Sequence, residues 1–382
     1  MSPRVNTSIF SDPNEGCLEM SWKCLLLGGI LLQCLSVVSS LDALQKVNLN
    51  TQEAICNDNS RAVVFIGIQT TKKWIIFFES GGLCTSKADC NQRYLNKNST
   101  VLMTSTLLPD KVIGRDILSS SKSENPAFFD HNHVLVPYCS SDLWLGESKT
   151  SQNGSFNFVN DSSVENFSFK GRTIFHSVFE ELDQKYNLSV AEEIVVSGSS
   201  AGGIGVLNHA KWLKSQNFTI NAKLLFIIDS AWFVNFQGGI KSRVKPEFAS
   251  LVGLSSDACT DMSYGYSCCL SASCLISRGF VPAVIQTAFV FSMYDIYMFA
   301  DVLKRLEDEG KTAENNVADF LSVVSMYGGA MNESLEISNA SLASFFVPAC
   351  FQHTYFSTSS LWDEDSVLRP LIEVTRDNGK FR

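Results

Sequence analysis

A serine on a glycine-rich turn is the residue with the clearest chemical potential in this chain. Residues 198–202 read G-S-S-A-G and match the pattern G-x-S-x-G, whose central residue is Ser200. An apolar run precedes this turn and a helical segment follows it. On a sharp strand-to-helix turn a serine hydroxyl stands above the sheet, close to a helix N-terminus that favours negative charge. The pattern therefore predicts that Ser200 is a nucleophile and that the backbone N–H of Ala201 points toward a developing oxyanion.

Two phosphate-binding interpretations of the same glycines fail. A P-loop needs Gly-Lys-Ser/Thr after the glycines, whereas the first lysine downstream is Lys211. A dinucleotide fingerprint needs G-x-G-x-x-G, which glycines at positions 198, 202, 203 and 205 do not supply. A tight packing turn remains as the alternative interpretation. Ser199 lies one place too early in the pattern to be the nucleophile.

A serine nucleophile requires a histidine base and an acid elsewhere in the chain. His353 follows in the order Ser, Asp, His that α/β hydrolases use, in a loop-like segment after Pro348. Asp295 closes the longest apolar run, at a predicted strand end, and is the preferred acid. Asp229 also ends a predicted strand and is its rival, with loop anchoring or capping as its alternative role. The remaining histidines are interpreted as surface or core residues: His131, His133, His176 and His209.

A second loop must supply further donors to the oxyanion. Gly81 and Gly82 follow the apolar run 73–79 after one residue, Ser80, and lie ahead of the serine in the chain. Their N–H groups can approach a substrate with no side chain in the way, although Gly-Gly is also common in ordinary turns. The position after an early strand matches the second oxyanion loop of α/β hydrolases.

The elements that position these residues alternate between strands and helices. Nearly continuous apolar runs, typical of strands covered on both faces, occupy residues 61–68, 73–79, 133–138, 192–198, 223–229 and 281–294. The clearest helical pattern covers residues 171–186. This alternation predicts an α/β-hydrolase-like fold, with a mostly parallel central sheet flanked by helices and functional loops at the carboxyl ends of the strands. We expect a single domain over residues 41–382.

The N-terminal region resembles a secretory signal. Lys23 precedes an apolar run over residues 24–35, and small residues follow as far as Ser40. Because this layout begins at Met20, residues 1–40 are interpreted as an upstream extension with a signal peptide, or as a type II membrane anchor. Cleavage near Ser40 is preferred. No later segment is predicted to span a membrane. A secreted, extracellular protein is therefore expected.

Composition agrees with export and narrows the partners. Nine cysteines beyond the signal indicate an oxidising compartment: Cys56, Cys84, Cys90, Cys139, Cys259, Cys268, Cys269, Cys274 and Cys350. Eight N-x-S/T sequons mark candidate glycosylation sites: Asn98, Asn153, Asn160, Asn166, Asn187, Asn217, Asn332 and Asn339. A net charge of −9 without a long basic run excludes nucleic acid as the expected partner. The cysteines lack paired C-x-x-C spacing, so no metal site is expected.

Taken together, seven motifs in order resemble the pectin acetylesterase and Notum family of secreted serine esterases. They are CNDNS, FFESGGLC, NPAFFDHNHVLVPYCSSDLWLG, VSGSSAGGIGVL, IIDSAWF, SMYD and VPACFQH. The resemblance implies the nucleophile, acid and base Ser200, Asp295 and His353, and oxyanion donors at Gly81, Gly82 and Ala201. It also implies disulfides Cys56–Cys139 and Cys84–Cys90, and neither a metal nor an organic cofactor.

The chain departs from the family pattern in two places. Ser80 replaces a glycine of the oxyanion loop, and Leu83 stands where plant-type members have tryptophan. A gap-free alignment with vertebrate members would put Val290 at the acid, whereas the Tyr294-Asp295 pair matches the plant-type pattern.

The resemblance leaves the substrate open between two esters. Animal members of the family remove palmitoleate from a Wnt serine, and plant members deacetylate pectin. A lipid tail needs a deep apolar pocket, which Trp232, Phe233 and the segment 280–299 could line, although core packing explains these residues equally well. The expected partner is thus an acylated, Wnt-like protein, with an acetylated glycan as the alternative. A non-catalytic secreted binding protein of the same fold is the alternative from another class.

Overall fold

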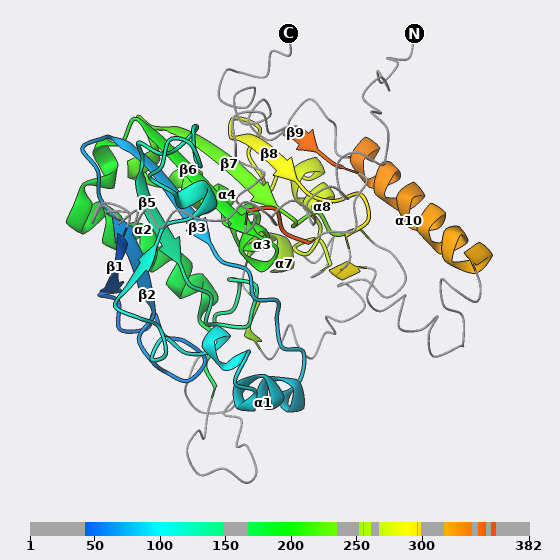
Figure 1. Cartoon of the computed structure of the whole chain (residues 1–382), viewed down its shortest axis with the longest axis horizontal. Helices are drawn as coiled ribbons and strands as arrows, with labels where there is room; N and C mark the ends of the chain where they lie inside the picture. Colours follow the sequence, from blue (N-terminus) through cyan, green and yellow to red (C-terminus); the bar gives the residue numbers. More distant parts are fainter. Residues whose placement is uncertain are drawn as a thin grey trace, which may run out of the picture.

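A nine-stranded sheet forms the centre of the molecule (Figure 1). The computed structural model describes residues 43–148, 167–234, 252–254, 256–260, 267–295, 297–298, 317–337, 343–348 and 353–356. Within these residues the strand order is β4-β1-β2-β5-β3-β6-β7-β8-β9. The strands are β1 (Ala43–Asn48), β2 (Val63–Gly67), β3 (Lys73–Phe78), β4 (Lys111–Ile113), β5 (Asn132–Val136), β6 (Glu193–Ser199), β7 (Lys223–Asp229), β8 (Gln286–Val290) and β9 (Ala343–Phe346).

The sheet is mostly parallel, which confirms the predicted α/β class. The neighbours from β5 through β9 all pair in parallel, whereas β1, β2 and β4 join through antiparallel pairs at one edge. Every residue of β6 is buried, as expected for a strand covered on both faces. In register, Ser199 at the end of β6 lies opposite Asp229 of β7, which in turn lies opposite Val290 of β8. The carboxyl ends of these strands therefore meet at one edge.

The apolar run at residues 281–294 is not one long strand. Only β8 (Gln286–Val290) pairs with neighbours, and Asp295 lies beyond the strand, directly after a turn at residues 293–294. Pro282 cannot donate to a ladder, and Phe291 and Ser292, the two residues after Val290, are buried although they lie outside the strand. Phe291, for example, stacks on Trp232 with ring centroids 5.7 Å apart. Apolar character here reports burial and not strand length.

Helices connect the strands. They are α1 (Lys87–Leu95), α2 (Gly171–Tyr186), α3 (Ala201–Asn208), α4 (Ala210–Ser215), α7 (Asp257–Thr260), α8 (Ala272–Ser277) and α10 (Val317–Ile337). Figure 1 shows α1 below the sheet and α10 at the right of the molecule. The predicted helix at 171–186 is confirmed as α2, and it ends where Asn187 takes a left-handed conformation with φ of 57°. Such a residue after the last turn is a common helix terminator.

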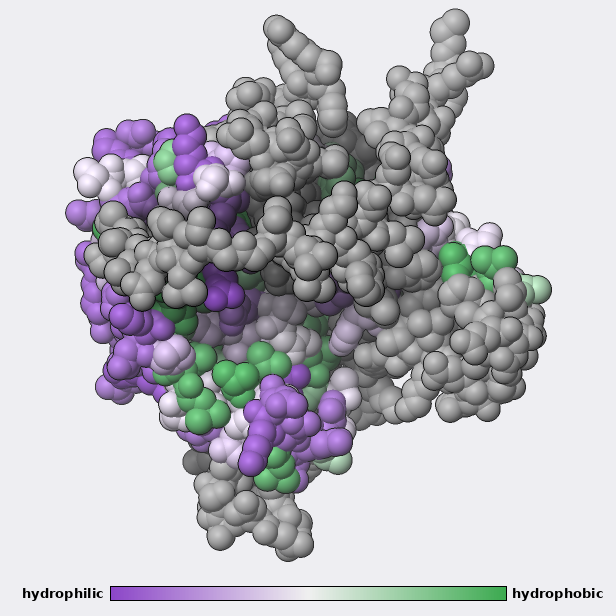
Figure 2. Space-filling view, viewed as in Figure 1, coloured by the Kyte–Doolittle hydropathy of each residue, from purple (hydrophilic) through white to green (hydrophobic). Residues whose placement is uncertain are grey.

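The two faces of the sheet are covered differently. The larger core lies between one face and helices α2, α3, α4 and α8. The smaller core lies on the other face, where the 3-10 turn at Asp116–Leu118, the Phe128 side chain and residues Tyr355 and Phe356 pack on the strands. Exposed large hydrophobic side chains such as Leu95 are scattered. Figure 2 accordingly shows hydrophobic side chains interspersed with hydrophilic ones on the face in view.

Four disulfides occur among the described residues. They are Cys56–Cys139, Cys84–Cys90, Cys259–Cys269 and Cys268–Cys274. The first two are the pairs that the family resemblance implies. The other two resolve pairings that sequence reasoning left open, and Cys350 lies outside the described residues.

Four of the predicted glycosylation sequons lie within the described residues, and the asparagine of each is exposed. These asparagines are Asn98, Asn187, Asn217 and Asn332. The sequons at Asn153, Asn160, Asn166 and Asn339 lie outside the described residues, as do the signal and extension assigned to residues 1–40. In the described ranges, no helix combines the length and apolar character needed to cross a bilayer.

Candidate active site

Ser200 occupies a strained turn between β6 and α3. Its φ of 49° and ψ of −111° lie in a region that residues with side chains rarely adopt. The Ser200 N–H donates to the carbonyl of Asp229 at 2.8 Å, and the Ser200 carbonyl accepts from Ile204 at 3.0 Å to start α3. The residue is 4% exposed. This is the strand-turn-helix context that the sequence pattern predicts for a nucleophilic serine.

Glycines surround Ser200 because backbone segments touch there. A Cβ at Gly198 would lie 2.6 Å from the carbonyl carbon of Gly202. A Cβ at Gly202 would overlap the carbonyl oxygen of Phe78, the last residue of β3. Any side chain at either position would push α3 away from the strands. The G-x-S-x-G pattern is therefore a packing requirement at this turn as well as a chemical one.

The loop after β3 brings Gly81 and Gly82 to the same edge of the sheet. Gly82 has a φ of +65°, which favours glycine, and a Cβ at Gly81 would overlap the ring of Tyr138. The Tyr138 hydroxyl donates to the Gly82 carbonyl at 2.8 Å, and Arg93 donates to the Gly81 carbonyl. Because the Gly81 carbonyl and the Gly82 N–H belong to one planar peptide unit, the contact from Arg93 fixes the orientation of the Gly82 N–H.

His353 and Asp295 form a close pair. The His353 Nδ1 lies 2.6 Å from the Asp295 Oδ2, and Asp295 is 4% exposed. The other oxygen of Asp295 accepts from the backbone N–H of Tyr297 at 2.9 Å, and the Tyr297 ring stacks on the imidazole. A carboxylate at Nδ1 favours the tautomer whose Nε2 is free to accept a proton. This pair can therefore serve as an oriented general base.

The nucleophile turn after β6 and the histidine loop after β9 both bind residues at the end of β7. The Thr354 N–H donates to the Ser230 hydroxyl at 2.9 Å, and Ser230 follows the residue that pairs with Ser199 in the sheet. Within the described residues, no hydrogen bond joins the Ser200 Oγ to His353. Catalytic hydrogen bonds are often long in a site without substrate and shorten when it binds.

Asp229, the rival acid, does not contact the histidine. It is fully buried and accepts hydrogen bonds from the Ser199 hydroxyl at 2.6 Å and the Ser230 hydroxyl at 2.8 Å. The backbone N–H groups of Tyr355 and Phe356 also donate to its carboxylate. The contacts match the loop-anchoring role that was the alternative interpretation of this residue.

The other histidines have structural surroundings. His131 lies between Asp130 and Glu193, and the His133 Nε2 lies 2.7 Å from the Phe128 carbonyl. His209 is held by the Trp144 carbonyl at 2.9 Å, and burial lowers its pKa to about 4.

The fourth, His176, stacks on Trp212. Burial is the main cause that lowers the pKa of His176 to about 2, with Coulombic effects of His209 and Arg172 adding to it. Among the described residues, the contacts of these four histidines are with other parts of the molecule, whereas His353 binds Asp295 and its neighbour Thr354 binds Ser230.

Trp232 and Phe233 lie in the core, each 3% exposed. The Trp232 ring packs against Phe289, Phe291 and Phe345, and its Nε1 donates to the Ser334 hydroxyl at 2.9 Å. These contacts correspond to the core-packing alternative for the two aromatic residues.

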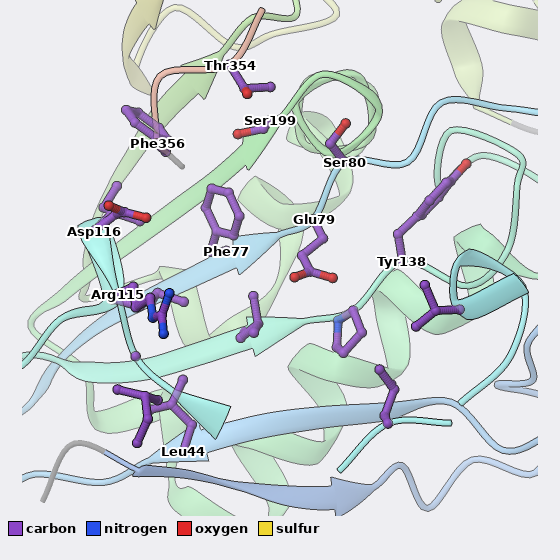
Figure 3. A pocket seen from close by; sticks show the side chains of 18 of the residues that line it. Leu44, Phe77, Glu79, Ser80, Arg115, Asp116, Tyr138, Ser199, Thr354 and Phe356 are labelled. Carbon is purple, nitrogen blue, oxygen red and sulfur yellow. The ribbon is translucent and has the colours of Figure 1, made fainter. Parts of the chain in front are cut away.

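A cavity of about 550 Å³ adjoins the catalytic edge on the other face of the sheet, and neither Trp232 nor Phe233 lines it. Its lining is mainly apolar, with Glu79 in the middle (Figure 3). Figure 3 shows Ser199 and Thr354 toward one end of this cavity and Arg115 toward the other.

Glu79 was not singled out by sequence reasoning, although it directly precedes the oxyanion loop. Burial raises the pKa of Glu79 to about 7, against the lowering effect of a backbone hydrogen bond from Tyr138. An acidic residue at the end of an apolar strand was the available signal. Within the described ranges there is no group of three or more His, Cys, Asp or Glu side chains placed to hold a metal ion.

Several known proteins are similar to this chain. A family model described as Pectinacetylesterase matches residues 39–373. The palmitoleoyl-protein carboxylesterase notum2 of Xenopus laevis is 34% identical over 184 residues, or 47% of this chain and 35% of that protein. The palmitoleoyl-protein carboxylesterase NOTUM of Drosophila melanogaster is 28% identical over 324 residues, or 81% of this chain and 44% of that protein. This chain thus spans less than half the length of these curated relatives.

A solved structure supports the fold. The structure of the Wnt deacylase Notum from Drosophila aligns with this chain at a TM-score of 0.71 and 24% sequence identity, and the alignment covers 89% of this chain and 95% of that chain. At this identity the likeness shows the shared α/β-hydrolase-like architecture. The match to the family description covers the nucleophile turn, the oxyanion loop and the His353–Asp295 pair.

Proposed function

The chain belongs to the pectinacetylesterase family, and from this premise we propose that it is a serine carboxylesterase that hydrolyses an O-acyl ester through Ser200, His353 and Asp295. The observation that carries the proposal is the hydrogen-bonded pair of His353 Nδ1 and Asp295 Oδ2 at 2.6 Å, together with the strained Ser200 turn after β6. Acyl transfer by a serine requires an imidazole that a carboxylate orients as general base.

In the proposed reaction the acyl group passes through the enzyme. His353 Nε2 removes the proton from the Ser200 hydroxyl as the Oγ attacks the ester carbonyl carbon, and Asp295 stabilises the resulting imidazolium. The tetrahedral intermediate collapses, the alcohol leaves with the proton from His353, and an acyl-Ser200 remains. Water then attacks this ester with His353 again as base, which releases the carboxylic acid and restores the serine.

Backbone N–H groups are proposed to stabilise the oxyanion. Ala201 is the first residue of α3, so its N–H has no partner within the helix. In the described part of the chain, no hydrogen bond is recorded for the N–H groups of Gly81 and Gly82. Donors fixed in advance at this point lower the barrier by stabilising charge that develops only in the transition state.

For the acyl group we propose a long fatty chain on a protein serine. The curated relatives are named as palmitoleoyl-protein carboxylesterases, which favours a lipid over an acetyl group. A carbohydrate O-acetyl ester is the second candidate, since the family itself is described as Pectinacetylesterase. Four disulfides and four exposed sequon asparagines among the described residues support synthesis in the secretory pathway and an extracellular location.

The test combines covalent labelling with hydrolysis of two esters. The secreted protein is treated with a fluorophosphonate probe, which reacts only with an activated serine, and its turnover of p-nitrophenyl acetate and p-nitrophenyl palmitate is measured. Ser200→Ala is expected to lose both labelling and turnover. The matched control is Ser199→Ala, which keeps the hydroxyl at position 200 and should still be labelled.

Four outcomes are decisive for the proposal. A preference of the wild-type protein for palmitate supports the lipid substrate, and strict preference for acetate selects the carbohydrate ester instead. Labelled or active Ser200→Ala would overturn the nucleophile. A folded wild-type protein that neither labels nor hydrolyses would be the non-catalytic binding protein.

A further inference from the structure

We propose that Asp229 is a positioning residue that joins the nucleophile turn to the histidine loop. The inference rests on the proposed esterase function, because it assigns Asp229 a role in holding Ser200 and His353 in register. Asp229 is the last residue of β7, between the strand that ends in Ser199 and the strand β8. It therefore lies between the segments that carry the two reacting side chains.

One carboxylate binds groups adjacent to both residues. The Ser199 hydroxyl donates to Asp229 Oδ2 at 2.6 Å, one residue before the nucleophile. On the other side, the Tyr355 N–H lies 3.0 Å from both carboxylate oxygens and the Phe356 N–H lies 3.2 Å from Oδ2. These donors follow His353 by two and three residues.

The backbone around Asp229 adds two more links. The Asp229 carbonyl accepts from the Ser200 N–H at 2.8 Å, which fixes the strained turn itself. The Ser230 hydroxyl donates to Asp229 Oδ1 at 2.8 Å and accepts from the Thr354 N–H at 2.9 Å. The chain of contacts thus reaches from the nucleophile's own peptide to the residue next to the base.

Burial makes this arrangement stiff. Asp229 is fully buried, and a buried carboxylate is costly unless donors surround it. Its donors come from the end of β6 and from the histidine loop, as well as from the adjacent Ser230, so neither segment can move without leaving the carboxylate short of partners. Desolvation raises the pKa of Asp229, while the hydrogen bonds from Ser199 and Ser230 oppose that effect.

Asp229 is distinct from Asp295 in what it contacts. Asp295 touches the imidazole, whereas Asp229 contacts hydroxyl and backbone donors. In an Asp229→Asn variant, one carboxylate oxygen is replaced by an NH₂ group. This group is a donor that faces other donors, so some of the hydrogen bonds to residue 229 would be lost. We expect the histidine loop to shift relative to Ser200, and a small misplacement of reacting groups lowers turnover strongly.

The test measures turnover per active site in Asp229→Asn. Active sites are counted by fluorophosphonate titration, so unfolded protein does not contribute, and kcat and KM are measured with p-nitrophenyl butyrate. We expect kcat per titrated site to fall about 100-fold with KM changed by less than about threefold, because substrate binding does not involve Asp229. Asp295→Asn provides the contrast, since its loss should be larger and should also distort the pH profile of kcat/KM, which Asp229→Asn should keep.

A pair of milder variants covers the case in which Asp229→Asn fails to fold. Ser199→Ala removes the link on the nucleophile side, and Ser230→Ala removes the link to Thr354. Each single variant should lower kcat per site about three- to tenfold. In the double variant, the fold-decrease in kcat should be smaller than the product of the two single fold-decreases, because both serines act through one carboxylate.

The results that would overturn the inference differ from those that would overturn the esterase. Unchanged kcat per titrated site in Asp229→Asn, or in both serine variants, contradicts the positioning role while leaving the esterase intact. A larger loss in Asp229→Asn than in Asp295→Asn, with the pH profile distorted, makes Asp229 the triad acid and also contradicts the inference. A wild-type protein without labelling or turnover overturns both proposals.

Discussion

The two halves of the candidate site are held together in different ways. In the nucleophile half, glycine backbone lies directly against backbone: Gly202 packs on the Phe78 carbonyl, and Gly198 packs on Gly202. In the histidine half, two buried carboxylates collect hydrogen bonds, Asp295 from the imidazole and Asp229 from loop donors. One half depends on the absence of side-chain atoms and the other on charged acceptors.

This difference teaches which perturbation each half tolerates. Close backbone packing resists any added atom but has no charge to titrate or screen. A hydrogen-bonded carboxylate tolerates small shape changes but responds to loss of its charge. Added volume should therefore damage the nucleophile half, and neutralisation should damage the histidine half.

The largest expected effect is neutralisation of the acid in the histidine half. Asp295→Asn keeps the shape but removes the charge that stabilises the imidazolium, and it can select the wrong tautomer of His353. We expect kcat to fall by about 10⁴-fold with little change in thermal stability. Steady-state kinetics and a thermal melt measure both quantities, with the exposed Asp257→Asn as control. Turnover close to that of the wild type would remove Asp295 from the mechanism.

Adding one methyl group should damage the nucleophile half next most. In Gly202→Ala the new Cβ would overlap the Phe78 carbonyl oxygen, so α3 and β3 must separate. We expect the free energy of unfolding to fall by about 3 kcal/mol. Gly329→Ala is the matched control, because nothing lies within 4 Å of its Cβ and α10 gains a better helix former. Urea unfolding measures the stability of both variants. If Gly202→Ala and Gly329→Ala were equally stable, the backbone at Gly202 would have room for a methyl group and the packing argument would be wrong.

A smaller effect is expected from Glu79, a group near the nucleophile half whose titration would make the stability of that half depend on pH. The folded-state pKa of Glu79 is raised to about 7 from 4.5, so the folded protein favours the protonated form. The stability that this group contributes is fully present below about pH 4.5 and is lost as the pH rises through about 7. Between pH 5 and pH 8, wild-type protein should lose about 2 kcal/mol more stability than Glu79→Gln, a figure reduced because the side chain is partly exposed to the cavity.

Urea unfolding at the two pH values measures this difference. Glu53→Gln, at an exposed position, serves as the control. If wild type and Glu79→Gln have the same pH dependence, the Glu79 carboxyl does not titrate between the two values, and charge sensitivity remains confined to the histidine half.

The smallest effect concerns a neutral hydrogen bond in the histidine half. Tyr355→Phe removes the contact between the Tyr355 hydroxyl and the Ser292 hydroxyl at 2.5 Å but keeps the backbone N–H that Asp229 binds. We expect a loss of about 1 kcal/mol in unfolding free energy and less than about a threefold change in kcat. A loss of kcat as large as that of Asp229→Asn would mean that the ring, and not the carboxylate, holds the loop.

Patterns of burial made much of the fold predictable. Helix α2 and strand β7 have the predicted bounds, because their apolar residues repeat with a clear period or run without interruption. Three strands were not predicted: β1 is half-exposed, and β4 and β9 have three and four residues. Such short elements form because a neighbouring strand offers free hydrogen-bonding groups, which local sequence does not record.

The site was predictable where local structure positions a residue and less so elsewhere. The Ser200 turn follows from its own glycines, whereas the roles of Asp229 and Asp295 depend on segments more than 50 residues away, as the separations of 126 and 58 residues to their partners show. The disulfides Cys259–Cys269 and Cys268–Cys274 interleave along the chain, and spacing alone allows other pairings.

The disulfide Cys84–Cys90 has a consequence for when the protein becomes active. Cys84 lies two residues after Gly82, and its bond to Cys90 in α1 closes the end of the oxyanion loop covalently. Such a bond persists only where thiols are oxidised. In a newly made chain in a reducing compartment, this disulfide would be absent and the loop would not be held at that end. We therefore expect that ester hydrolysis begins only after the disulfide has formed, once the chain has left the cytosol.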